Sequence, residues 1–375
     1  MSSSNTKSGT AAAGKPSTLK IPAWSIISPA VCWLLLLGLA FGARGTIYAA
    51  LLGIGLISAV LSAVHHAEVV AHRVGEPLGT LVLALAVTMI EVALIVSLML
   101  SGGPAATALA RDTVFATIMI ILNGLLGLCL LVGGGNFGEQ SFGLRGVSAS
   151  LATLAAIAAL TLVLPNYTTT VIGPFYSASQ LGFVATVSLI LYGTFIFVQT
   201  VRHRDYFLPP EAAPDPDSHA VPPSNRMALI SAALLLSCIG AVVIIAEALA
   251  PTVEAVVHAA GAPDTLVGII IASIVLMPEG FAAVRAARRD RLQTSLNLTL
   301  GSALASIGFT IPAVAIISII AGWTLTLGLD TKGTVLLALS LFVASLSLNT
   351  GRTTILQGAV HLVLFAVYLF TIVVP

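Results

Sequence analysis

The chain has 375 residues, of which 57% are hydrophobic and only 8% are charged. A soluble globular domain carries about 25% charged residues, so this composition excludes an ordinary water-soluble fold and indicates a protein that faces lipid. The net charge of +1 also argues against a nucleic-acid partner, which would favour a basic stripe on the protein.

In chain order, residues 1–23 are polar and have no apolar pattern, and they are predicted to form a disordered cytoplasmic tail. Apolar runs then recur at the length of about 20 residues that a helix needs to cross a bilayer. Eleven membrane-spanning helices are predicted, at residues 24–41, 46–64, 79–100, 113–133, 146–164, 179–199, 227–250, 265–284, 294–320, 332–348 and 355–374. The proline-rich segment 200–226 is predicted to be a cytoplasmic linker that divides the chain near its middle. The fold class is therefore an all-α polytopic membrane protein.

The basic residues predict the orientation. With the N-terminus in the cytoplasm and eleven crossings, most lysines and arginines fall on the cytoplasmic side, namely Lys7, Lys15, Lys20, Arg73, Arg145, Arg202, Arg204, Arg226, Arg285, Arg288, Arg289, Arg291 and Arg352. The other side has Arg44, Arg111 and Lys332. This bias is the one that the positive-inside rule expects of a multi-pass membrane protein with a cytoplasmic N-terminus.

The two halves of the chain contain related features. The third helix contains Met89-Ile90-Glu91 and the eighth contains Met277-Pro278-Glu279, and each is followed by a loop with Arg and Asp. We therefore predict one extra helix at 24–41, a first five-helix repeat at 46–199 and a second at 227–374. Because five is an odd number of crossings, the second repeat would be inverted in the membrane.

Glu91 is a charged residue inside an otherwise apolar run. It lies twelve residues after Gly79, or about 18 Å along a helix at 1.5 Å per residue, which places it near mid-membrane. Ionisable residues at such depth are costly, and most of them mark ion or proton paths. The alternative is a neutral carboxyl that hydrogen-bonds to a neighbouring helix as a packing device.

Glu279 lies in a similar run, between Pro278 and Gly280. Proline has no N–H group and leaves the carbonyl four residues earlier, that of Ile274, without its helical partner. Broken helices of transporters offer such carbonyls to cations. The alternative is a simple kink near the cytoplasmic end, where Glu279 would pair with Arg285 or Arg289. We predict that Glu91 and Glu279 carry protons and bind the metal ion.

Polar side chains near the two acids could complete an oxygen cage for Ca²⁺ or Na⁺. Ser295, Thr299, Ser302 and Ser306 recur on one face of the ninth helix, and Asn123 is expected to face that stripe from the fourth. The candidate cation ligands are Asn123, Thr88, Ser302, Thr299, Ser306 and the carbonyl of Ile274. Serine and threonine are also common at contacts between membrane helices, which is the structural alternative for the stripe.

A polar segment precedes the third helix. Its candidate residues for a proton-collecting cytoplasmic vestibule are His65, Glu68, His72 and Glu76. A solvated interfacial helix is an equal alternative, and a zinc site is a weaker one.

Several motifs are absent. The sequence has no Walker loop, nucleophile elbow or His-Glu-x-x-His motif, so nothing indicates a nucleotide-driven pump or an intramembrane hydrolase. Cys32, Cys129 and Cys238 lie in apolar runs and are interpreted as small packing residues.

Two stretches carry a family resemblance. The first comprises His65-His66-Ala67-Glu68, Gly75-Glu76-Pro77-Leu78-Gly79-Thr80 and Ile90-Glu91-Val92-Ala93-Leu94-Ile95. The second comprises Pro278-Glu279-Gly280, the arginine-rich loop after it and Asn297-Leu298-Thr299-Leu300-Gly301-Ser302. They resemble the signatures of bacterial Ca²⁺(Na⁺, K⁺)/H⁺ antiporters of the cation/proton-exchanger branch of the Ca²⁺:cation antiporter superfamily. The resemblance implies an extra first helix plus two inverted five-helix repeats, with Glu91 and Glu279 as their essential acids. It also implies a location in the inner membrane of a bacterial cell.

The expected activity is secondary transport. A carboxyl in a low-dielectric site favours its neutral form, so the pair would cross the membrane loaded either with a cation or with protons, which couples the two fluxes. The expected partners are the lipid bilayer, protons and transported Ca²⁺, Na⁺ or K⁺, with no enzymatic activity and no separate cofactor. A passive cation or proton channel that uses the same acids is the main rival, and a scaffold with structural glutamates is another. The oligomeric state and the preferred cation stay open.

Overall fold

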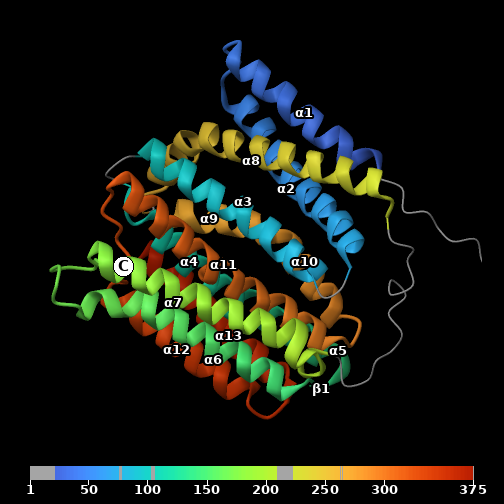
Figure 1. The fold of residues 1–375 in the computed structure, drawn as a ribbon, viewed down its shortest axis with the longest axis vertical. Coiled ribbons are helices and arrows are strands. Elements are labelled where there is room, and N and C mark those ends of the chain that lie inside the picture. The colour runs from blue at the N-terminus through green and yellow to red at the C-terminus, as the bar shows by residue number, and fades with distance from the viewer. Residues whose placement is uncertain are drawn as a thin grey trace, which may run out of the picture.

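The computed structural model describes residues 22–75, 78–102, 106–208, 223–261, 263 and 265–374. The described chain is mostly helical (Figure 1), with the helices α1 Ala23–Ala40, α2 Thr46–Val74, α3 Leu78–Gly102, α4 Leu109–Met119, α5 Leu126–Phe137, α6 Leu144–Ala158, α7 Ala178–Phe197, α8 Asn225–Ala259, α9 Thr265–Val275, α10 Met277–Ala287, α11 Leu292–Ala321, α12 Thr331–Leu348 and α13 Ile355–Val373. Shorter elements are the π-helices η2 Ile120–Leu125, η3 Ala159–Val163 and η5 Val198–Arg202, the 3₁₀-helices η4 Leu164–Tyr167 and η6 Arg204–Phe207, and the antiparallel strands β1 Glu139–Ser141 and β2 Arg352–Thr354. Most of the predicted tail and linker lies outside the described residues.

The membrane-spanning helices agree with the prediction. In the described part of the chain, ten helical segments are long and apolar enough to cross a membrane, or eleven when α9 and α10 count as one bent span. Two helices run well past their predicted ends. Helix α2, predicted to end at residue 64, continues to Val74, and α8, predicted to end at residue 250, continues to Ala259. The apolar run marks only the part of such a helix that lies in lipid, whereas the helix itself continues until a residue breaks it. Gly75, with a φ of 76°, ends α2 in this way.

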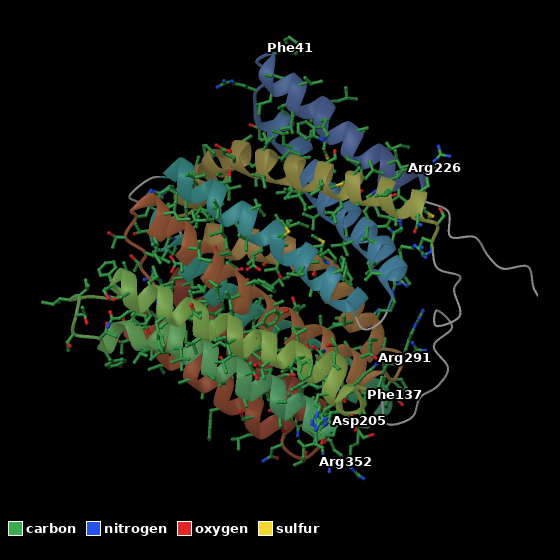
Figure 2. All side chains as sticks on the ribbon, viewed as in Figure 1. Phe41, Phe137, Asp205, Arg226, Arg291 and Arg352 are labelled. Atoms are coloured by element: carbon green, nitrogen blue, oxygen red, sulfur yellow. The ribbon has the colours of Figure 1, made fainter. Side chains whose placement is uncertain are left out.

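Successive membrane-spanning segments run in opposite directions, with α4 and α5 forming one segment and α9 and α10 another, so the loops gather at two ends of the molecule. One of them, which we call the arginine-rich end, carries Arg73, Arg145, Arg202, Arg204, Arg226, Arg285, Arg288, Arg289, Arg291 and Arg352. Figure 2 shows Arg226, Arg291 and Arg352 at this end. The opposite end carries Arg44, Arg111 and Lys332 among the described basic residues.

The two halves of the chain pack reciprocally. The first helix of each half, α2 and α8, pack along one another. Helix α3 of the first half packs against α11 of the second, and its counterpart α9 packs against α4, the first part of the span that corresponds to α11. Likewise, α7 packs along α11, and its counterpart α13 packs along α5, the second part of that span. Contacts that exchange in this manner are expected of two repeats related by a two-fold axis.

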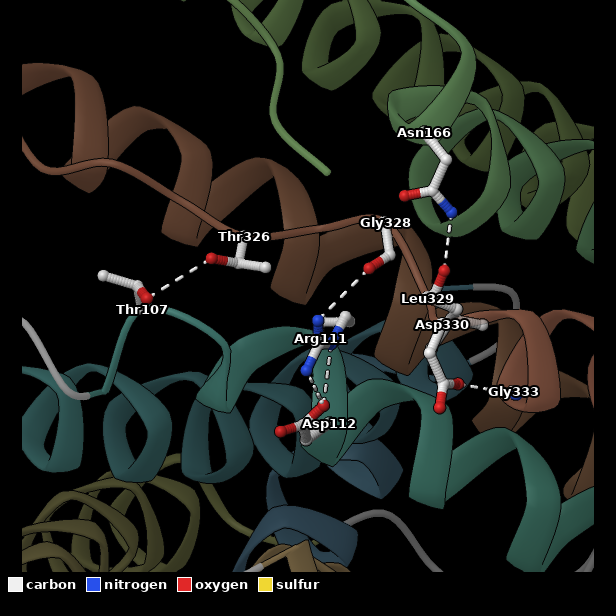
Figure 3. A network of polar contacts seen from close by, with 9 residues as sticks. All are labelled: Thr107, Arg111, Asp112, Asn166, Thr326, Gly328, Leu329, Asp330 and Gly333. Carbon is white, nitrogen blue, oxygen red and sulfur yellow. Dashed lines mark hydrogen bonds and ion pairs between the residues drawn. The ribbon is translucent and has the colours of Figure 1, made fainter. Parts of the chain in front are cut away.

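Hydrogen bonds fasten the bundle in the same manner at both ends. At the opposite end, Arg111 at the start of α4 pairs with Asp112 and donates to the carbonyl of Gly328, at 3.2 Å, in the loop after α11 (Figure 3). At the arginine-rich end, Gln140 of β1, in the connection after α5, donates to Asp290, just before the start of α11, at 2.6 Å. In each case a loop of one half is bonded to the start of a helix of the other half: the loop after α11 to α4, and the connection after α5 to α11.

The buried apolar side chains form two main cores. The larger one joins α4, α5, α6, α7, α11, α12 and α13. The second joins α1, α2 and α8, which lie together at the top of Figure 1. Helices α3 and α9 contribute to both, for example through Ile90 to the second core and Ile95 to the larger one.

Glycines allow α5 and α13 to touch. A Cβ atom at Gly134 would lie 2.5 Å from the backbone nitrogen of Ile355, whereas a Cβ at its neighbour Gly135 would meet nothing within 4 Å. We therefore expect Gly134→Ala to lower the free energy of unfolding by about 1–3 kcal/mol, because backbone must move to relieve the overlap. Gly135→Ala is the matched control and should be neutral or stabilising, since alanine favours a helix over glycine. Thermal unfolding in detergent measures both; equal melting temperatures would contradict this packing.

Candidate functional site

A cavity of about 450 Å³ extends from the arginine-rich end into the molecule. Helices α2, α3, α7 and α11 and the junction of α9 with α10 form its walls. Its mouth includes the exposed residues Glu68 and Arg204, and its lining also includes Glu91 and Glu279. The two predicted acids, which are 188 positions apart in the sequence, therefore share one cavity.

Glu91 lies where the cavity ends. It is 7% exposed and belongs to α3, which is continuous at this point. The Ser306 hydroxyl of α11 donates a hydrogen bond of 2.6 Å to its carboxylate oxygen Oε1. Among the described residues, a small void of about 10 Å³ lies beyond Glu91 toward the opposite end, lined by apolar side chains together with Thr113 and Thr117. Among the described residues, the large cavity therefore reaches Glu91 from the arginine-rich end and does not continue past it toward the opposite end.

Glu279 lies just after a break. Helices α9 and α10 meet at Leu276 with a bend of 58°, so the break expected beside Pro278 is present. Glu279 occupies the first turn of α10, where the partial positive charge of a helix N-terminus favours a carboxylate. Its oxygen Oε2 is buried and has no hydrogen-bond partner among the described residues. A buried polar atom of this kind indicates a position that is ready to receive a ligand or a proton.

The predicted hydroxyl ligands fall into two groups: two serines that face the cavity or Glu91, and two threonines whose hydroxyls bond a carbonyl of their own helix. Ser302 lines the cavity, and Ser306 binds Glu91. Thr88 also lines the cavity, but its hydroxyl donates to the carbonyl of Ala84 at 2.8 Å. Thr299 is buried, and its hydroxyl donates to the carbonyl of Ser295 at 3.0 Å in its own helix.

Ile274 and Asn123 lie away from the cavity lining. The side chain of Ile274 instead lines an apolar groove of about 410 Å³ among α2, α8 and α9. Asn123 donates to the Ser340 hydroxyl of α12 at 2.8 Å, and its side-chain oxygen lies 3.4 Å from Nδ1 of His361 of α13. The expectation that Asn123 faces the hydroxyl stripe is therefore not met in this conformation. It belongs to the π-helix η2, whose wider turn changes the direction in which side chains leave the helix.

The histidine segment is the last part of α2, not a separate interfacial helix. Of the predicted vestibule residues, Glu68 lines the cavity. His65 packs against the ring of Trp24 in α1, with 5.4 Å between ring centroids. His72 is exposed, and its Nδ1 lies 2.8 Å from the carbonyl oxygen of Glu68. Glu76 lies outside the described residues. No group of three or more His, Cys, Asp or Glu side chains that could hold a metal was found among the described residues, so these residues give no support to the zinc alternative.

The cavity has polar lining residues that the sequence did not single out. Tyr192 of α7 lines it, with a buried hydroxyl that has no partner among the described residues. Its ring packs where a Cβ at Gly308 of α11 would lie, 2.8 Å away. Asn297 also lines the cavity and donates to the carbonyl of Phe207 at 2.6 Å, which holds η6 at the mouth. A single tyrosine in an apolar helix gives no sequence signal for this role, whereas the polar pair Gln293 and Asn297, one turn apart, is a signal that could have been used.

Comparison with known proteins identifies the family. The family model described as "Sodium/calcium exchanger protein" matches residues 44–201 and 230–374. The chain is 49% identical over 359 residues to the "Putative ionic transporter y4hA" of Sinorhizobium fredii, covering 95% of this chain and 97% of that protein. It is 38% identical over 321 residues to the "Sodium-potassium/proton antiporter ChaA" of Escherichia coli, covering 85% and 87% respectively.

Solved structures agree with this assignment at the level of the fold. "Structure of native YfkE" aligns with a TM-score of 0.70 at 18% identity, covering 94% of this chain and all of that one. "Crystal Structure of H+/Ca2+ Exchanger CAX" aligns with a TM-score of 0.70 at 20% identity, covering 92% of this chain and 87% of that one. The match to the family model spans most of the chain, in both of its halves. The chain is therefore a multi-pass membrane protein that belongs to the sodium/calcium exchanger family.

Proposed function

We propose that this protein is a secondary antiporter that exchanges a metal cation for protons, with Glu91 and Glu279 as the groups that bind both. One observation carries the proposal. Both acids line a single cavity that reaches the surface at the arginine-rich end, whereas in the described part of the chain this cavity gives way to a small void beyond Glu91. A site that is open to one side and closed to the other is what alternating access requires, and it disfavours a continuous channel.

The exchange cycle follows from charge. With the cavity open, Glu91 and Glu279 release protons and bind the cation, with oxygen ligands from Ser302 and with Ser306 holding the Glu91 carboxylate. Two unneutralised carboxylates are too costly to enclose in a low-dielectric core. The site therefore closes only when it carries a cation or protons, and this restriction couples the two fluxes. No cofactor takes part in this scheme.

The donor set allows two substrate classes. Two carboxylates neutralise one Ca²⁺, or one Na⁺ or K⁺ together with one proton, and hard oxygen ligands suit all three ions. The relatives divide in the same manner. The Escherichia coli protein is named a sodium-potassium/proton antiporter, and a Ca(2+)/H(+) antiporter of Aphanothece halophytica is 26% identical over 325 residues.

We also propose that the arginine-rich end faces the cytoplasm of a bacterial cell, as the positive-inside rule expects. In that orientation the structure is open to the cytoplasm, and proton entry would drive cation export.

Everted membrane vesicles with an imposed pH gradient test the function. Ca²⁺, Na⁺ and K⁺ are added separately, and the internal pH is followed with a fluorescent probe. An antiporter dissipates the gradient when its cation is added, and each ion that does so is a substrate. If no cation changes the internal pH, the proposal fails; if cations cross without proton movement, the channel reading replaces it.

Ser306 provides a test of the Glu91 environment. We expect Ser306→Ala to raise the KM for the cation by about tenfold, because the carboxylate loses a hydrogen bond that stabilises its ionised form. Ser345→Ala is the control, since that hydroxyl is exposed and bonds only the carbonyl of Leu341 in its own helix. Equal KM values for the two variants would show that the Ser306 contact does not support cation binding.

A further inference from the structure

The ends of α2 and α8 carry a matching sequence. Residues 67–72 of α2 read Ala-Glu-Val-Val-Ala-His, and residues 253–258 of α8 read Val-Glu-Ala-Val-Val-His. In both, a glutamate precedes a histidine by four positions, so the two side chains share a helix face. Both motifs also lie at similar distances before the essential acid of their half, since Glu68 is 23 positions before Glu91 and Glu254 is 25 before Glu279.

The two motifs lie at opposite ends of the molecule. Helix α2 runs toward the arginine-rich end and α8 runs away from it, and the motif is near the C-terminal end of each. These helices pack along one another as the first helices of the two halves. An operation that exchanges the halves therefore exchanges Glu68 at one end with Glu254 at the other.

Glu68 lies at the end of the molecule where the cavity is open in this structure. It is exposed, and it lines the same cavity as Glu279. A carboxylate in this position attracts a cation from solution and raises its local concentration near the buried pair.

We propose that Glu254, with His258, is the counterpart of Glu68 and His72 and contacts the cation at the mouth that opens at the opposite end. This inference rests on the proposed function and goes beyond it by assigning the residues of a vestibule that is closed in this structure. Glu254 is exposed. Next to it, Ala250 and Val253 line the apolar groove among α2, α8 and α9.

The experiment compares the two faces of the membrane. Glu68→Gln and Glu254→Gln are each assayed in everted and in right-side-out vesicles, with the pH gradient set so that Ca²⁺ or Na⁺ enters from the outer solution. We expect Glu254→Gln to raise the KM about three- to tenfold only for cation presented at the opposite end. Glu68→Gln should do so only for cation presented at the arginine-rich end.

The controls keep the test decisive. Glu254→Asp retains the charge and should keep the KM near the wild-type value. Glu139→Gln removes an exposed carboxylate that pairs with Arg352 and should leave the KM unchanged at both faces of the membrane. If Glu254→Gln leaves the KM unchanged, or changes it equally on both faces, the inference is overturned. If the wild-type protein exchanges no cation on either face, the proposed function itself is overturned, and the inference with it.

Discussion

Replacing Glu91 with glutamine is expected to lower proton-coupled cation exchange by about 100-fold or more. Glutamine has nearly the same shape and can still accept the hydrogen bond from Ser306, so the fold around it should persist. It carries no negative charge and cannot exchange a proton. Removing one partner of a buried charge pair costs about 3–5 kcal/mol, and each 1.4 kcal/mol is a factor of ten in binding.

Glu279→Gln should have an effect of similar size, because both acids are needed to neutralise the cation. The initial rate of cation-induced proton movement in everted vesicles measures each variant, and Glu139→Gln, an exposed acid, is the control. Expression and thermal unfolding in detergent confirm that the variants fold. Exchange at the wild-type rate by either variant would remove that glutamate from the site, even if the protein remained an antiporter.

A large side chain at Gly301 should block the cavity. Gly301 lines the cavity on α11, and a Cβ atom built there meets nothing within 4 Å. Tryptophan at this position would therefore extend into open space and occupy the volume that the cation and its water need. We expect Gly301→Trp to reduce exchange by about tenfold or more, which corresponds to a loss of about 1.4 kcal/mol or more of cation binding.

Gly301→Ala is the matched control. Alanine adds one methyl group that contacts nothing and favours the helical conformation of α11, so exchange and melting temperature should stay near wild type. The same vesicle assay measures both variants. Full activity of Gly301→Trp would mean that the cation does not pass through the cavity described above.

The sequence predicted the features that depend on spacing along one helix. The membrane spans follow from apolar length, and the bend between α9 and α10 follows from Pro278. The pairing of Glu91 with Glu279 followed from their equivalent places in the two halves, and the structure does bring them into one cavity.

Features that depend on local helix geometry were not predictable in this manner. The direction of Asn123 depends on a π-helical turn, which an α-helical projection cannot anticipate. Ser302 and Thr299 were expected on one face, yet Ser302 lines the cavity whereas the Thr299 hydroxyl donates to the carbonyl of Ser295 in its own helix. His65 could not be assigned to α1 or to the cavity from the sequence, because both lie beside α2.

The separation of the buried apolar side chains into two cores has a mechanical consequence. Ties at both ends, such as those of Arg111 and Asp290, stiffen the larger core. The smaller core of α1, α2 and α8 meets it along α3 and α9. Sliding two cohesive blocks over one another preserves the packing inside each, and it costs less than deforming either block. The seam between the blocks passes beside both glutamates, so one rigid-body shear would change which solvent reaches them.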